Sequence, residues 1–216
     1  MKKYILSAFV VFGSVVNVLA QTDAKAKQIL NEVSKKYRSY DVIKTDFTFT
    51  LDNPQAKIKE TQAGTLYAKA KSNKYKVVMK GQDLISDGKT QWTYLKNEKE
   101  VQVNDVDNSP NAINPAKIFT IYEKGFKYLY TGDTKVGGKV QHVIDLSPVD
   151  TKRSFFKVRL NIDKATKQIS NAIIFDKNGN KYTYAMKAFS PNVKVPESTF
   201  AFDAKKYPGV SVEDLR

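Results

Sequence analysis

The sequence has no cysteine and only one histidine, and its 216 residues include few glycines (10) and prolines (7). Without cysteine, the chain cannot build thiolate nucleophiles, cysteine zinc sites, iron–sulfur clusters or disulfides. The lone His142 also removes most histidine-built metal sites and nucleophile–base pairs. Low glycine and proline content with 12% aromatic residues argues against a collagen-like or disordered chain. No G-x-S-x-G nucleophile elbow occurs. A globular fold is therefore expected, and an enzyme is the weaker functional class.

Long hydrophobic runs are also missing after the first residues. Lys2–Lys3 precede an apolar run over residues 4–16, which ends at Val18-Leu19-Ala20. This is the order of a secretory signal peptide. We therefore expect residues 1–20 to be removed on export, leaving residues 21–216 as one domain located in the periplasm. No cysteine follows the apolar run, so we expect no lipid anchor on this protein.

Hydrophobic periodicity predicts one helix followed by many strands. Between Asp23 and Tyr40 the apolar residues recur at helical spacing, with lysines on the opposite side. Further along, the period changes to two, which is typical of strands in an antiparallel sheet. The predicted strands lie within residues 47–51, 64–70, 74–80, 84–86, 92–94, 101–104, 126–131, 140–146, 156–162, 169–175 and 182–188.

Turn-forming and helix-capping residues predict two type I′ hairpins and a second helix. Asp87-Gly88 and Asn178-Gly179 are the dipeptides that favour type I′ turns. Asn114 as the cap, Pro115 at the first position and Gly125 at the end predict a helix over residues 115–124. About ten strands form a sheet wide enough to curl or close, so its concave face must be filled by side chains, by helices or by a ligand.

The charge is strongly positive, with 36 Lys and Arg against 22 Asp and Glu, or +14. The basic residues are dispersed along the polar faces of the expected elements, which indicates a solvated basic surface rather than a nucleic-acid site. Attraction to anionic lipid headgroups is the functional alternative. Gly88-Lys89-Thr90 resembles the end of a P-loop but lacks the earlier glycine and the following helix, so we interpret it as a hairpin turn.

One segment resembles a known family. The run from Leu84 to Tyr94, with Ser86-Asp87-Gly88-Lys89 followed by Trp92 and Tyr94, is similar to the SDGK-x-x-W-x-Y segment of the periplasmic outer-membrane lipoprotein carriers (LolA-type). The similarity extends in order to other parts of the chain. These are the first helix leading into Phe47, Gly64–Tyr67, Glu100–Val103, Asn114-Pro115, Phe200–Phe202 and Pro208–Val210.

This resemblance implies a mainly β (α+β) fold, an incomplete antiparallel β-barrel whose amphipathic helices cover the concave face. It implies a monomeric carrier without catalytic activity, cofactor, metal or nucleic-acid partner, which shields lipoprotein acyl chains in an apolar cavity. Its partners would be acylated lipoproteins or lipids, an inner-membrane release complex and an outer-membrane acceptor. The expected cavity and lid residues come from matched positions (Tyr75, Val77, Leu84, Trp92, Ile118, Phe119) and from alternation or helical spacing (Ile29, Leu30, Val33, Phe47, Phe49, Val158, Leu160).

Two alternatives remain open. In the first, the protein carries free lipid or pigment instead of lipoproteins. In the second, it is a periplasmic enzyme or sensor whose concave face is solid core. The family's Arg-Pro pair, whose Arg latches the lid, is replaced here by Lys69-Ala70-Lys71-Ser72. For a carrier, we expect the helices over 26–37 and 115–124 to swing away from the sheet when an acyl chain enters.

Overall fold

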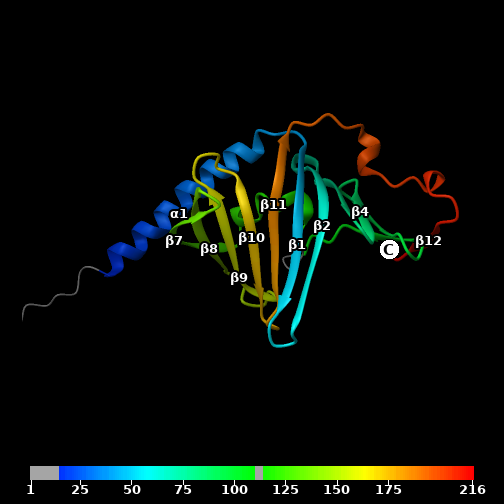
Figure 1. Ribbon diagram of the computed structural model, residues 1–216. Helices are drawn as coiled ribbons and strands as arrows, with labels where there is room; N and C mark the ends of the chain where they lie inside the picture. Colours follow the sequence, from blue (N-terminus) through cyan, green and yellow to red (C-terminus); the bar gives the residue numbers. More distant parts are fainter. Residues whose placement is uncertain (1–14, 110–113) are drawn as a thin grey trace, which may run out of the picture.

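The computed structural model describes residues 15–109 and 114–216, so the first part of the expected signal peptide (1–14) lies outside the described residues. Twelve strands form one curved sheet in the order β12-β6-β5-β4-β3-β2-β1-β11-β10-β9-β8-β7 (Figure 1). Neighbours pair antiparallel except β12, which lies parallel to β6. The sheet stays open between β12 and β7, which confirms the predicted incomplete barrel. The strands are β1 Ile43–Asn53, β2 Ile58–Lys69, β3 Lys74–Met79, β4 Gln82–Ser86, β5 Thr90–Leu95, β6 Glu100–Asp105, β7 Phe126–Val136, β8 Lys139–Pro148, β9 Phe155–Asp163, β10 Ile169–Asp176, β11 Lys181–Pro191 and β12 Ser211–Asp214.

The helix α1 (Val15–Arg38) packs along β7 and covers one half of the concave face (Figure 1). It begins before the predicted Asp23, and the expected cleavage site after Ala20 falls inside it, so the signal peptide stays a prediction. None of the described helices combines the length and apolar composition needed to cross a membrane. The buried stripe of α1 comes from residues three and four apart, as its periodicity predicts: Ala26, Ile29, Leu30, Val33 and Tyr37.

The predicted second helix over 115–124 is wrong in type. The segment forms two 3₁₀ turns, η2 (Pro115–Lys117) and η3 (Ile121–Glu123), and Thr120 between them has a φ of −134°. The predicted capping residues nonetheless act at the start of η2, because the Asn114 side chain accepts a hydrogen bond from Ala116 N and Pro115 occupies the first position. Apolar side chains in this segment point to more than one side, and short 3₁₀ turns allow this spread better than one amphipathic helix does.

Both predicted hairpins exist, but neither is type I′. A type I′ turn needs positive φ at both central residues. Only the glycines meet this requirement, Gly88 with φ 99° and Gly179 with φ 86°, while the residues on either side of them do not. Asp87 Oδ1 instead accepts the backbone N–H groups of Lys89 and Thr90, at 2.9 and 2.8 Å. The side chain of Asp87 therefore closes the β4–β5 turn.

The main core lies on the concave face between α1, the 115–125 segment and the sheet. Under α1 this core is closed, and its members from β8 to β10 are almost fully buried: Ile144, Leu146, Val158, Leu160, Ile162 and Ile174. Packing at this density holds α1 on the β7–β10 half. The β1–β4 half has no such helix above it among the described residues, so a different arrangement covers it.

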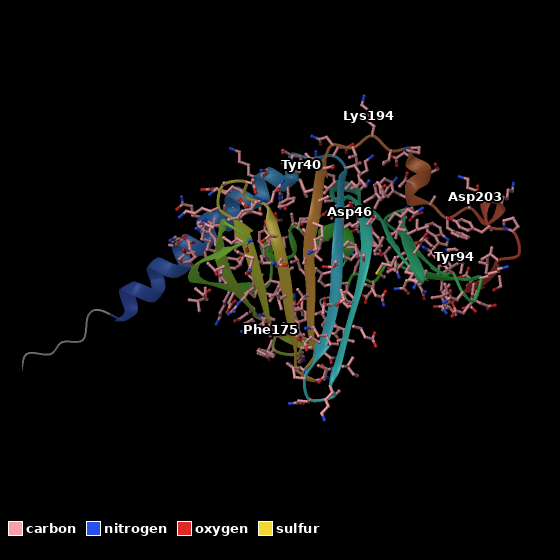
Figure 2. The ribbon with its side chains drawn as sticks, viewed as in Figure 1. Tyr40, Asp46, Tyr94, Phe175, Lys194 and Asp203 are labelled. Carbon is pink, nitrogen blue, oxygen red and sulfur yellow. The ribbon has the colours of Figure 1, made fainter. Side chains whose placement is uncertain are left out.

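The C-terminal segment packs on the outer face of β3 to β6. It includes η4 (Glu197–Phe200), which contacts β3 and β4, and η5 (Ala204–Lys206). The Tyr94 ring lies 6.1 Å from Phe202 and 4.8 Å from Tyr207, measured between centroids. Figure 2 shows Tyr94 near Asp203 at this end of the molecule. The chain's own C-terminal segment therefore partly covers the outer face of β4–β6.

Candidate apolar binding site

A pocket of about 270 Å³ lies on the concave face of the β1–β4 half. Three strands on one side of it, β1, β3 and β4, supply most of its wall, and β11 and the start of η2 complete it. The pocket has nine lining residues: Phe47, Phe49, Val77, Met79, Gln82, Leu84, Pro115, Ile118 and Tyr184. None of the nine carries a charge.

The register of the ladder explains why these side chains converge. Residues directly opposite one another in an antiparallel pair point to the same face. Val77 pairs with Leu84 on one side and with Leu66 on the other, which aligns three apolar side chains on the concave face. Phe47 pairs with Gly64. A Cβ at Gly64 would lie 2.8 Å from Phe47 Cζ, so the absence of a side chain there is what allows this ring its position.

The roof of the pocket comes from the 3₁₀ segment. Ile118 and Pro115 line the pocket, whereas the next residue, Phe119, stacks on Tyr37 of α1 with centroids 4.7 Å apart and planes 9° apart. Ile118 is 7% and Phe119 3% exposed. Neighbouring residues thus bind the segment to the pocket on one side and to the helix on the other. On the pocket side the roof makes apolar contacts, which a hydrocarbon chain can replace.

The wall of the pocket stays electrically neutral. Burial raises the pKa of the Tyr184 hydroxyl, so this group remains protonated at physiological pH. Gln82 supplies the one amide side chain among the lining residues. An uncharged lining of aromatic and aliphatic groups binds hydrocarbon by removing apolar surface from water, and it offers nothing that would neutralise an ionised head group.

The apolar surface continues beyond the pocket toward the far end of the sheet. Phe49 stacks with Tyr182 of β11 at 6.1 Å, and Leu51 follows on the same face of β1. Leu51 and Tyr182 are both half-buried, because α1 packs on β7 and η2 packs on β2 and β3, away from this end of β1 and β11. A chain longer than the pocket therefore has an apolar path along the inner face of these two strands.

The structure brings together five of the thirteen residues selected from the sequence. Phe47, Phe49, Val77, Leu84 and Ile118 line the pocket. The others, apart from Trp92, are placed in the surrounding core. Phe119 and Tyr75 are buried beside the pocket, while the remaining five lie in the closed core under α1: Ile29, Leu30, Val33, Val158 and Leu160.

The register separates Trp92 from the pocket. Trp92 pairs with Ile85 and Val103, so it shares their face, and Leu84 points to the opposite face. Ile85 and Val103 are buried on the side of the C-terminal segment and are not part of the concave-face core. The resemblance assigns Trp92 and Leu84 to one cavity, and this assignment is wrong for Trp92. The reason is geometric, because the β4–β5 register places Leu84 opposite Thr93, and neighbours along a strand point to opposite faces.

Four pocket residues were missed by the sequence reasoning: Met79, Gln82, Pro115 and Tyr184. Alternation contained a signal for two of them. Met79 continues the series of Tyr75 and Val77, and Tyr184 lies opposite Phe49 in a strand that alternates in the same way. Gln82 had no such signal, because a polar residue at a strand end is ordinary.

The lone histidine belongs to a polar network between two strands. Across residues 15–109 and 114–216, no group of three His, Asp or Glu side chains lies close enough to hold a metal ion. His142 is 4% exposed, and its Nδ1 lies 2.6 Å from Asp133 Oδ1. Asp133 also accepts from Tyr130 Oη at 2.6 Å, and this hydrogen bond lowers the pKa of Asp133. The group is a polar network that fastens β7 to β8.

Comparison with known proteins identifies a family and a fold. A family model described as outer membrane lipoprotein carrier protein LolA matches residues 38–203. The structure is similar to an uncharacterized conserved protein from Thermus thermophilus, at a TM-score of 0.55 and 15% identity over 88% of this chain and 99% of that one. It is also similar to a DUF1329 family protein from Desulfovibrio piger, at 0.52 and 12% identity over 83% and 97%. At such identities the similarity shows the fold alone. Comparison with curated proteins finds no match.

Proposed function

Because this chain belongs to the family of outer membrane lipoprotein carrier proteins, LolA, we propose that it is a carrier that shields acyl chains in the apolar pocket. The observation that carries the proposal is the uncharged pocket itself, whose lining is almost entirely aromatic and aliphatic. The cargo is the acyl part of a lipoprotein, moved from the inner to the outer membrane. An inner-membrane complex would release the lipoprotein to this carrier, and an outer-membrane acceptor would receive it from the carrier.

The location and maturation belong to the same proposal. Residues 1–20 act as a cleaved signal peptide, and residues 21–216 work in the periplasm as one monomeric domain. Acyl chains need an escort in such an aqueous compartment. Exposing a chain of about fifteen methylenes to water costs on the order of 12 kcal/mol, at about 0.8 kcal/mol per methylene.

A carrier must also release its cargo, and two features of the site favour moderate affinity. The pocket volume of about 270 Å³ lies slightly below the range of roughly 300–1,000 Å³ typical of drug-sized ligand sites, so only part of a chain fits without movement. Entry of the rest requires displacement of the roof segment around Ile118 or exposure of the chain along Phe49 and Tyr182. Both costs reduce the net binding free energy, which keeps the complex well short of the limit of noncovalent affinity.

Filling the pocket tests the binding step. The double substitution Val77→Phe with Leu84→Phe adds two rings to the pocket wall, and we expect it to weaken binding of an uncharged fluorescent fatty-acyl ester at least tenfold. Val78→Phe is the matched control, because Val78 is on the same strand with its side chain on the outer face. Equal binding by the double variant and the wild-type protein, with both still folded, contradicts the proposal.

The cargo is tested by mass spectrometry of what co-purifies with the protein from the periplasm. Acylated polypeptides support a lipoprotein carrier. If only free lipid or pigment co-purifies, the proposal of an acyl-binding site stands, but the cargo is not a lipoprotein. If nothing apolar co-purifies and no acyl probe binds the purified protein, the carrier proposal fails.

A further inference from the structure

A second pocket, of about 440 Å³, lies on the other side of the 3₁₀ segment from the apolar pocket. It is formed by the end of α1, the start of β1, η1 (Ala70–Ser72) and the segment from Asn114 to Lys124. The two pockets share no lining residue. Ile118 lines the first and Phe119 lines the second, so the 3₁₀ segment forms the wall between them.

The floor of this second pocket is aromatic and aliphatic. Tyr37, Ile43 and Phe119 are all buried, at 2%, 3% and 3% exposure, and Tyr40 and Ile121 flank them. The Tyr37 hydroxyl accepts a hydrogen bond from Ile169 N at 3.0 Å, and burial raises its pKa, so it adds no charge. This floor gains from contact with hydrocarbon, as the wall of the apolar pocket does.

The rim is strongly basic. Arg38, Lys71, Lys117 and Lys124 line the pocket, with Glu123 as the only acidic residue among the lining residues. Arg38 already holds Glu123 in an ion pair. The three lysines are exposed and make no ion pair with any acidic group of the described residues. Three positively charged side chains without an ion-pair partner among the described residues therefore surround an apolar floor.

We propose that this basic-rimmed pocket is a second binding site, which takes an anionic amphiphile. The ionised head, a carboxylate or a phosphate, is held by Lys71, Lys117 and Lys124, and the apolar body lies on the floor made by Tyr37, Ile43 and Phe119. A free phosphate would satisfy only the rim, and a neutral lipid only the floor. The apolar pocket cannot take this ligand's head, because its lining has no charge. The inference does not rest on acyl binding in the apolar pocket.

The rim lysines set the expected size of the effect. Each interacts with the head group near the surface, where the effective dielectric is high and salt screens the attraction. Removing all three charges should therefore weaken binding about tenfold or more at low ionic strength, and much less at 1 M salt.

The test uses four probes with the purified protein: dodecanoate, dodecyl phosphate, dodecanol and inorganic phosphate, each below its aggregation concentration. We expect both anionic amphiphiles to bind at least tenfold more tightly than dodecanol, and inorganic phosphate to bind weakly. The triple variant Lys71→Gln, Lys117→Gln, Lys124→Gln should lose that preference. A control triple variant of exposed lysines that line neither pocket, Lys135→Gln, Lys152→Gln, Lys205→Gln, should keep it.

Two results would overturn the second site. One is equal affinity for dodecanol and the anionic probes, or an equal loss in both triple variants. The other is loss of anionic binding in the pocket-filling variant Val77→Phe with Leu84→Phe, because the ligand would then occupy the apolar pocket. That second result would leave the acyl-carrier proposal standing. Conversely, anionic binding that survives in the pocket-filling variant supports the second site even if no acyl chain enters the first.

Discussion

Arg38, in the last turn of α1, makes a two-point ion pair with Glu123 in η3, and its Nε lies 2.8 Å from Glu123 Oε1. One turn earlier on the helix, Ser34 Oγ lies 3.2 Å from the hydroxyl of Tyr122. The segment that roofs the apolar pocket is therefore fastened to α1. The stretch Lys69–Ser72, where the family pattern has its latching Arg, makes a different contact, from Lys69 Nζ to Glu197 Oε1 at 2.6 Å.

Breaking the Arg38–Glu123 pair should make the roof easier to displace. We expect Arg38→Gln to increase the rate of acyl-probe uptake by several-fold while changing the thermal midpoint little, because the Arg38 side chain is 67% exposed and such pairs add little stability. Stopped-flow fluorescence of probe binding measures the rate. Lys35→Gln is the control, since this exposed lysine on the same helix has no ion pair among the described residues.

Locking the same two positions should have the opposite effect. The chain has no native cysteine, so Arg38→Cys with Glu123→Cys can be joined by a short bifunctional thiol reagent without side reactions. We expect the joined protein to lose most acyl-probe uptake and the unjoined double variant to retain it. Unchanged uptake after joining would show that the roof does not move.

Glu197 should hold the C-terminal segment on the sheet in a pH-dependent way. Hydrogen bonds from Lys69 and Lys74 lower the pKa of Glu197 to about 2. Its pKa in the unfolded chain is higher, so the pairing stabilises the fold above that unfolded value and is lost as the pH falls through about 2. The thermal midpoint of Glu197→Gln should therefore lie below that of the wild-type protein near neutral pH, and the difference should vanish in strong acid. Glu213→Gln, at an exposed position without an ion pair among the described residues, should show no such trend.

A side chain at Gly64 should destabilise the fold, because neighbouring atoms of the pocket wall occupy the space that the side chain would need. An added Cβ would lie 2.8 Å from Phe47 Cζ and 2.9 Å from the carbonyl oxygen of Val78. We expect Gly64→Ala to lower the free energy of unfolding by about 1–3 kcal/mol, as overpacking does. Gly81→Ala, where no atom lies within 4 Å of the added Cβ, should stay within about 0.5 kcal/mol of the wild-type protein. Urea denaturation measures both. A Gly64→Ala protein as stable as Gly81→Ala would contradict this packing.

Trp92, the single tryptophan of the chain, should not respond to acyl binding. It faces the side of Ile85 and Val103, away from the pocket, so its emission maximum should stay constant as an acyl ligand is added. A reporter in the pocket, Leu84→Trp combined with Trp92→Phe, should shift to the blue under the same titration. A blue shift from Trp92 in the wild-type protein would instead place this ring against the ligand.

Alternation in the sequence predicted the strands and the shared face of Phe47 with Phe49 and of Tyr75 with Val77. Alternation alone does not tell which of two covered faces holds the pocket, and the outer face around Trp92 is partly covered by a C-terminal segment, in which Phe202 and Tyr207 pack on Tyr94. The basic-rimmed pocket left no local pattern either. Tyr37, Ile43, Lys71 and Lys117 come from four separate elements, and only the tertiary fold brings them together.

The central claim is that an acyl chain occupies the apolar pocket, and photo-crosslinking tests it most directly. An uncharged fatty-acyl methyl ester with a diazirine at its methyl end would be bound, irradiated and mapped by mass spectrometry of the digested protein. We predict that crosslinks fall in the peptides that carry Phe47, Val77 and Ile118, and that excess unlabelled ester removes them. Crosslinks confined to the outer face around Trp92, or equally frequent in the denatured protein, would contradict the account.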